Sequence, residues 1–214
     1  GEVLSAPLVA PTAVVVRTVD GRLVALARED GHELWSVEQQ IPRLTLRGVA
    51  APVLAGDVVL CGFDNGKVVG ASLRDGSVLW ETAVAPPRGR TELERLSDID
   101  SRVLVSGDNV FAVGFQGRIA MLALDTGQIW WSRDLSSYRG LALDGDHLYI
   151  STAEGDLVAM DSRTGGEVWP QSVGSQLAGL CVGSKEDERT LDVCAAPGGK
   201  ATMLAGDVVA VEAN

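Results

Sequence analysis

The pattern that decides the fold is NGKVVGASLRDGSVLW, at residues 65–80. A polar residue and a glycine open it, a second glycine follows ten residues after the first, and a tryptophan follows fourteen after the first. The same three positions recur in register, which gives four copies: Asp20-Gly21 to Trp35, Asn65-Gly66 to Trp80, Gln116-Gly117 to Trp131, and Glu154-Gly155 to Trp169. Internal periodicity of this kind predicts a repeat architecture.

Each copy reads as short strands joined by tight turns. An apolar run such as Val14-Val15-Val16 precedes the first glycine, and the polar-glycine pair supplies the positive φ that a two-residue hairpin needs. A second pair such as Asp75-Gly76 turns the chain into the strand that ends on tryptophan. The tryptophans are 45, 51 and 38 residues apart, which matches one propeller blade per copy. We therefore predict an all-β fold, a β-propeller fragment of four four-stranded blades over residues 1–172.

The repeated tryptophans are expected to be packing wedges between neighbouring blades. A large ring at one repeat position buries much area per residue, so the repeat explains these side chains without a cofactor. We predict that all four indoles occupy equivalent, mostly buried positions.

Composition narrows the class of partner. The formal net charge of −11 repels phosphate backbones, so we expect no nucleic acid partner and favour a basic patch on a partner protein. No window approaches the roughly 18 continuous apolar residues of a membrane span, and no targeting segment opens the chain. Cys61, Cys181 and Cys194 lack metal-ligand spacing, which indicates small buried apolar residues. We expect neither a metal nor a cofactor.

The Thr-Gly-x-x-x-Trp endings resemble the tryptophan-docking repeats of pyrroloquinoline-quinone-type propellers, a class that holds both dehydrogenases and non-enzymatic scaffolds. Two segments outside the repeat, 41–52 and 90–100, are more specific. Ile41-Pro42-Arg43-Leu44-Thr45-Leu46-Arg47-Gly48 and the run ending Ser97-Asp98-Ile99-Asp100 resemble loops of the BamB family of outer-membrane assembly lipoproteins. The likeness covers residues 6–172.

This resemblance implies a non-enzymatic protein-binding scaffold built on an eight-bladed propeller. Family members are tethered by an N-terminal lipid at the periplasmic face of the outer membrane. There they bind the periplasmic domains of the barrel-inserting subunit BamA and help to deliver unfolded outer-membrane proteins. Carried over by motif, the implied partner-binding residues are Leu44, Leu46, Arg47, Asp98 and Asp100. Apolar anchors beside an arginine that can bind a carboxylate fit such a role.

Other interpretations of these residues remain open. Leu44 and Leu46 would also suit strand positions that face the core. Asp98 and Asp100 would suit a solvated loop, a calcium ligand pair or a glycosidase-type acid pair. No third ligand or companion motif accompanies the two acids, which counts against calcium binding and against catalysis.

The sequence departs from the family pattern in two ways. It holds four repeats where the resemblance implies eight blades, and it lacks the lipid-bearing cysteine. A half ring leaves two blade faces exposed, so we expect self-association through exposed blade edges, recruitment of a cap, or poor stability.

The last forty residues do not follow the repeat. Residues 173–190 read as a linker, and 191–214 resemble the S-adenosylmethionine-binding motif of RNA cytosine-5 methyltransferases of the Sun and NSUN type. In that interpretation a glycine-rich turn approaches the cofactor and an acid binds the ribose hydroxyls. The cofactor-binding residues it implies are Ala196, Pro197, Gly198, Gly199, Lys200 and Glu212.

We expect no methyltransferase activity, because the catalytic-cysteine motifs are missing and residues 201–207 are too few for a full crossover helix. The alternatives are an inactive methyltransferase remnant and an engineered or recombined chimera without native activity. A structural alternative comes from Leu204 to Val209, which repeat Leu54 to Val59 letter for letter. In that case the tail would add strands to a partial fifth blade.

Overall fold

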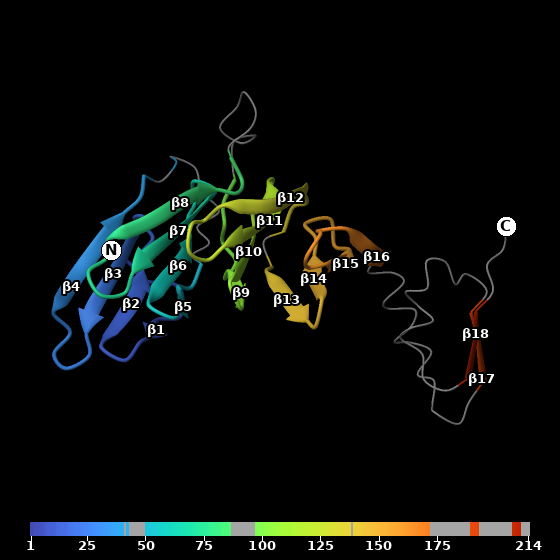
Figure 1. The fold of residues 1–214 in the computed structure, drawn as a ribbon, viewed down its shortest axis with the longest axis horizontal. Helices are drawn as coiled ribbons and strands as arrows, with labels where there is room; N and C mark the ends of the chain where they lie inside the picture. Colours follow the sequence, from blue (N-terminus) through green and yellow to red (C-terminus); the bar gives the residue numbers. More distant parts are fainter. Residues whose placement is uncertain are drawn as a thin grey trace.

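The computed structural model describes residues 1–40, 42, 50–86, 97–137, 139–171, 189–192 and 207–210. Four four-stranded antiparallel sheets follow one another along the chain, one for each copy of the repeat (Figure 1). Within these ranges every regular element is a β-strand. The prediction of an all-β propeller fragment with four four-stranded blades is confirmed.

Each blade is a simple meander in which strands adjacent in sequence are adjacent in the sheet. The first blade has β1 (Leu8–Val9), β2 (Ala13–Arg17), β3 (Arg22–Ala27) and β4 (Glu33–Glu38); the second has β5 (Val53–Ala55), β6 (Val58–Gly62), β7 (Lys67–Ser72) and β8 (Val78–Ala83). The third has β9 (Leu104–Ser106), β10 (Asn109–Val113), β11 (Arg118–Ala123) and β12 (Ile129–Asp134); the fourth has β13 (Leu141–Asp144), β14 (His147–Ser151), β15 (Leu157–Asp161) and β16 (Glu167–Gln171).

The backbone repeats as closely as the sequence does. The repeat glycines adopt positive φ, as at Gly66 (74°) and Gly76 (71°), a conformation that side chains rarely tolerate. The exception is the third copy, where Gln116 (48°) takes the positive φ in place of Gly117. The last two strands of every blade show the same register shift, a β-bulge, just before the tryptophan. The shifts lie at Ala25/Leu26, Gly70/Ala71, Met121/Leu122 and Ala159/Met160.

Tryptophans fasten each blade to the next one. The indole N–H of Trp35 donates to the carbonyl of Leu73 at 2.9 Å, and Trp80 and Trp131 donate in the same way to Leu124 and Ser162. Each of these three indoles is at least 92% buried, at 7–8% exposure. The predicted wedge role is confirmed for these three. Trp169 shares their backbone register, but its side chain lies outside the described side chains.

The core consists of three apolar clusters, and each cluster joins two neighbouring blades. Alternate residues of the two central strands of a blade face opposite neighbours, as a strand period of two requires. In β6, for example, Val59 packs toward the first blade and Leu60 toward the third. The blades are therefore held together by apolar burial between sheets.

The tail forms a separate small sheet of β17 (Arg189–Asp192) and β18 (Asp207–Ala210). These two strands pair in parallel, whereas the strands within each blade are antiparallel. The expectation that the tail adds strands to a partial fifth blade is wrong for these residues, because they pair only with each other. β17 also begins two residues before the predicted end of the linker, whose residues 173–188 lie outside the described ranges.

Candidate functional site

The segment 97–101 connects the second blade to the third and is fixed between them. The Ile99 N–H donates to the Phe63 carbonyl at 3.2 Å, and the Asp98 carbonyl accepts from the Phe115 N–H at 2.9 Å. The Ile99 side chain is fully buried against Gly62, where any side chain would collide with it. The segment is thus held in one conformation by both blades.

A buried arginine lies beside this segment. Arg17, the last residue of β2, is fully buried, and its Nη2 donates to Asp64 Oδ1 at 2.9 Å. Its guanidinium carbon stands 4.4 Å from the centroid of the Phe63 ring, a cation–π contact. The Arg17 Nε and Nη1 atoms have no hydrogen-bond partner among the described residues. One acid therefore uses only part of the hydrogen-bonding capacity of this guanidinium.

Four charged groups from successive parts of the propeller act on one another here. We call Arg17, Asp64, Asp98 and Asp100 the charged cluster. Burial raises the pKa of the half-buried Asp100 to about 7; Asp98 and Asp64 add to the rise, and Arg17 opposes it. Asp100 therefore exchanges its proton near neutral pH. A cation placed beside it would favour the ionised carboxylate.

The two predicted acids, Asp98 and Asp100, differ in burial. Asp98 is fully buried, so it does not offer the exposed contact that its implied partner-binding role requires. Its segment is held against the second and third blades by backbone hydrogen bonds. Asp100 keeps part of its surface exposed. Leu44, Leu46 and Arg47 lie outside the described residues, so their convergence with the acids stays a prediction.

Arg17 and Asp64 were not predicted from the sequence. A signal was nevertheless present, because Arg17 stands four residues before the first glycine of its repeat. The equivalent residues of the other copies are Gly62, Val113 and Ser151, none of them charged. A charged residue at the end of an apolar strand, present in one repeat and absent from the others, is the signal that could have indicated Arg17.

The described residues offer little for catalysis. They contain no group of three His, Cys, Asp or Glu side chains that could hold a metal ion. Burial raises the pKa of the Cys61 thiol to about 12, so this cysteine is an inert buried residue, as predicted. Cys181 and Cys194 lie outside the described ranges, as do Ala196, Pro197, Gly198, Gly199, Lys200 and Glu212.

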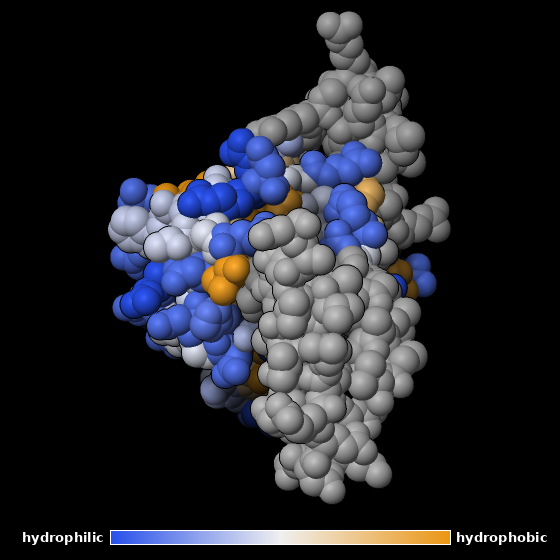
Figure 2. Space-filling view, turned by 90° about the vertical axis from the view of Figure 1, so that its right-hand side faces the viewer, coloured by the Kyte–Doolittle hydropathy of each residue, from blue (hydrophilic) through white to orange (hydrophobic). Residues whose placement is uncertain are grey.

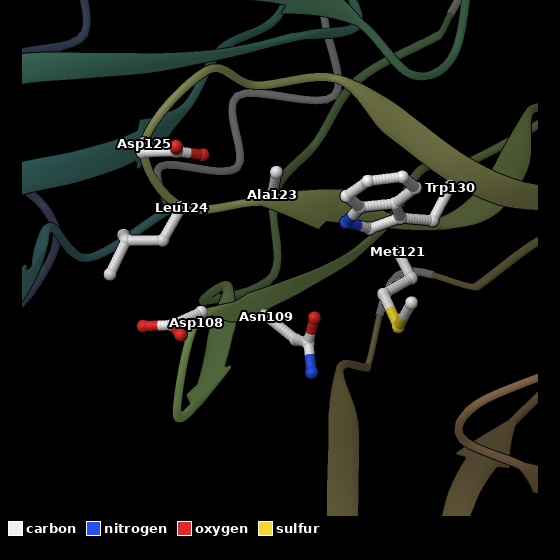
Figure 3. Close-up of a pocket in the computed structure, with 7 residues that line it drawn as sticks. All are labelled: Asp108, Asn109, Met121, Ala123, Leu124, Asp125 and Trp130. Carbon is white, nitrogen blue, oxygen red and sulfur yellow. The ribbon is translucent and has the colours of Figure 1, made fainter.

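A pocket of about 620 Å³ lies on the third blade. Figure 3 shows the Trp130 ring beside Met121, with Asp108 and Asp125 at the turns on the other side. Trp130 is 57% exposed, and the residues lining the pocket include no His, Ser or Cys beside the acids. The pocket offers a surface contact and lacks a nucleophile–base pair.

The described residues that are visible in Figure 2 are mainly polar. Seen from the right-hand side of Figure 1, the described residues are largely hydrophilic, and apolar residues form small separate spots (Figure 2). Among the described residues there is also no helix long and apolar enough to cross a membrane.

Comparison with known proteins identifies relatives of the propeller. Residues 1–171 match the family model described as outer membrane protein assembly factor BamB. The chain is 40% identical over 152 residues to the outer membrane protein assembly factor BamB of Vibrio cholerae, a match that covers 71% of this chain and 39% of that protein. The chain thus spans about two fifths of the length of the curated relatives it matches. The family match ends before the tail and gives no support to the methyltransferase interpretation.

Solved structures agree with the sequence match. The crystal structure of BamB from Moraxella catarrhalis superposes with a TM-score of 0.74 at 28% identity, covering 78% of this chain and 51% of that one. Quinohemoprotein alcohol dehydrogenase from Comamonas testosteroni gives a TM-score of 0.66 at 15% identity, over 80% of this chain and 35% of that one. The second likeness shows the fold alone.

Proposed function

Because the chain belongs to the BamB family of outer membrane protein assembly factors, we propose that it is a non-enzymatic binding scaffold for outer membrane protein assembly. The curated relatives carry the name of an assembly factor and not of an enzyme, in line with this role. The site of action that follows is the periplasmic face of the outer membrane. Since the chain spans about two fifths of those relatives, the proposal concerns the share of the task that four blades perform.

The proposed partner is the periplasmic region of a BamA-like protein, and unfolded outer-membrane proteins are its proposed cargo. The contact surface consists of Leu44, Leu46 and Arg47 together with Asp100. The observation that carries the proposal is the match of residues 1–171 to the family of the outer membrane protein assembly factor BamB. The half-buried Asp100, whose pKa burial raises to about 7, fits it, because a positive group supplied by a partner would favour the ionised carboxylate.

Asp98 has a different role in this proposal. It is fully buried and carried by the segment that both blades hold, so it acts as a positioning residue. Its charge, together with that of Asp64, raises the pKa of Asp100. The two charges therefore make Asp100 favour a cation from the partner more strongly. Arg17 limits this effect and keeps the cluster from becoming wholly acidic.

The chemistry of the surface sets the kind of partner patch. Two leucines supply apolar anchors, and truncation of one such anchor typically costs about 1–3 kcal/mol of binding free energy. Arg47 pairs with a carboxylate of the partner, while Asp100 pairs with a lysine or arginine. The net charge of −11 favours a partner patch that is basic overall.

The test is a binding titration of this chain with the purified periplasmic domains of a BamA protein. We expect the Leu44→Ala/Arg47→Ala double variant to bind about tenfold or more weakly, and Asp100→Asn to bind about three- to tenfold more weakly. The matched control is Leu79→Ala/Arg74→Ala, which removes an exposed leucine and an exposed arginine from the second blade. The control should bind as the wild type does.

Circular dichroism of each variant separates lost binding from lost folding. Equal affinity of the wild type and the double variant would contradict the proposed surface. Absence of any binding by a folded wild type would contradict the proposed partner.

A further inference from the structure

The third blade carries an acid at a turn where two other blades carry an arginine. A backbone hydrogen bond of 2.7–2.9 Å fixes the equivalent turn in these three blades; its donor and acceptor are Leu73 and Asp57, Leu124 and Asp108, and Ser162 and Asp146. The residue after the donor is Arg74 in the second blade and Arg163 in the fourth, but Asp125 in the third. In the fourth blade Arg163 Nη2 lies 3.5 Å from Asp146 Oδ2, so an arginine of the chain balances the acid there.

Asp108 and Asp125 line one pocket without a basic partner. The pocket of about 620 Å³ on the third blade, which we call the third-blade pocket, has both acids and no lysine or arginine among its lining residues. Both acids are exposed, and neither forms an ion pair with another described residue. Two carboxylates in one hollow create a negative potential that attracts a cation. The charge of the third-blade pocket therefore favours a basic ligand.

The other side of the third-blade pocket is apolar and also departs from the repeat. Met121 stands opposite Trp131, where the other blades place a small residue beside their tryptophan: Ala25, Gly70 and Ala159. Trp130 stands where the other copies have Leu34, Leu79 and Val168. The Trp130 ring lies beside Met121 (Figure 3) and is 57% exposed. An exposed indole offers a face on which an aromatic ring or the stem of a long basic side chain can stack.

The position of the third-blade pocket separates it from the charged cluster. The third blade packs against the second blade and against the fourth, so both of its neighbours are present. Asn109 lines the pocket at the start of β10, whereas the Phe115 N–H, beyond the other end of this strand, donates to the Asp98 carbonyl. Five extended residues span roughly 15 Å. A ligand in the pocket therefore need not touch the segment 97–101.

We propose that the third-blade pocket binds a basic side chain on an extended segment of the unfolded cargo. The cation lies against Asp108 and Asp125, in the place that an arginine of the chain takes in the fourth blade. A neighbouring aromatic residue of the segment stacks on Trp130. The volume of the pocket lies in the range of small-ligand sites, so two adjacent side chains can enter together.

The choice of cargo as the occupant rests on the proposed function, whereas the chemistry of the pocket does not. An unfolded chain leaves neighbouring basic and aromatic side chains free to enter a hollow together. The net charge of −11 favours the approach of basic segments over acidic ones.

Nitrogen-15 NMR of the full chain, titrated with the blocked dipeptide acetyl-Phe-Arg-amide, tests the proposal. The readouts are the Trp130 indole N–H and the Asn109 side-chain amide, because both residues line the pocket. We expect saturable shifts with a Kd of about 1 mM, and weaker binding at high salt because salt screens the charges. The neutral isostere acetyl-Phe-citrulline-amide should bind about tenfold or more weakly, since it lacks the cation.

Variants locate the binding site. Asp125→Arg gives the third blade the arginine of the second and fourth blades, so it should pair with Asp108 and weaken dipeptide binding about tenfold or more. Trp130→Leu, which installs the residue of the first two copies, should weaken it about threefold or more. The matched control is Glu29→Arg, the same change of charge at the equivalent exposed position of the first blade. The control should bind the dipeptide as the wild type does.

Each outcome decides the matter. Equal binding of the arginine and citrulline dipeptides would overturn the role of the cation, and equal binding by the wild type and Asp125→Arg would overturn the site. If circular dichroism shows that Asp125→Arg is unfolded, Trp130→Leu decides through the Asn109 amide. A Trp130 signal that moves when the free chain is diluted would place a second copy in the pocket and overturn cargo as the occupant.

Absence of saturable shifts in both readouts would overturn the pocket as a binding site. Because the titration contains no BamA domains, that result would leave the proposed BamA contact standing. Loss of the BamA contact would likewise leave the dipeptide result standing.

Discussion

At the end of β2 a fully buried arginine stands where the other repeats have glycine, valine or serine. Arg17 stacks on Phe63 and binds Asp64, so it ties the first blade to the second beneath the segment that carries Asp98 and Asp100. A buried pair of this kind is costly to desolvate, and removal of one partner leaves the other charge uncompensated. The pair therefore adds little to the net stability of the fold, but both of its charges act on Asp100.

Replacement of Arg17 by methionine should destabilise the fold by about 3–5 kcal/mol, because Asp64 would be left as a buried charge without its partner. Urea denaturation measures the change. The double variant Arg17→Met/Asp64→Leu should recover a large part of that loss, since neither charge remains. Additive effects of the two substitutions would show that the pair does not act as a unit.

Asp100 should make the stability depend on pH. Its pKa rises from the usual 3.8 to about 7 in the folded chain, so the folded state holds a proton that the unfolded state has released across that window. Stability contributed by this group is full below pH 4, falls as the pH rises to 7, and is level above. The groups that set this behaviour are Asp98, Asp64 and Arg17.

Asp100→Asn removes that dependence. Relative to the wild type, the variant should melt a few degrees higher at pH 8 and at the same temperature near pH 4 (roughly 2–4 °C for each kcal/mol of stability). The control is Asp125→Asn, at an exposed turn of the third blade. Equal melting temperatures of Asp100→Asn and the wild type at pH 8 would mean that Asp100 carries no strain.

At the scale of elements, the blade-to-blade joint is a tryptophan on a glycine. Trp35 rests on Gly76 so closely that a methyl group there would stand 2.7 Å from the indole. The glycine thus serves twice, because its φ of 71° also forms the turn between β7 and β8. This double demand explains why a glycine stands at this turn in every repeat.

The joint can be separated from the turn by two alanine substitutions. Gly76→Ala and Gly107→Ala both place a side chain at positive φ, but Gly107 faces open space. Each should lose about 1 kcal/mol to backbone strain, and Gly76→Ala should lose roughly 1–3 kcal/mol more through the displaced indole. Chemical denaturation gives both values. Equal losses would contradict the docking role of Trp35.

At the scale of the whole molecule, the sequence predicted the blades because their signals are local. Turn chemistry at Gly66 and Gly76 and the tryptophan fourteen residues after the first glycine lie within one hairpin unit. The charged cluster could not be predicted in this way. It joins residues 17, 64, 98 and 100, and their proximity depends on how successive blades stack.

Two further features depend on more than local sequence. Asp98 was assigned to the partner-binding residues through the family resemblance, yet it is fully buried in a segment that backbone hydrogen bonds hold against two blades. The direction in which β17 and β18 pair was also not predicted, because the likeness of Leu204 to Val209 with Leu54 to Val59 favoured a blade. A matching sequence can specify that a segment forms a strand, but it does not specify which strand that segment pairs with.

The most direct test of the central claim, a BamA-binding scaffold with its contact beside the charged cluster, is hydrogen–deuterium exchange of this chain with and without the BamA periplasmic domains. We expect slower exchange on binding in peptides covering 41–50 and 97–103, and no change in the exposed turn of Gly107 and Asp108. Binding that leaves both of those segments unchanged, or that protects only other blades, would contradict it.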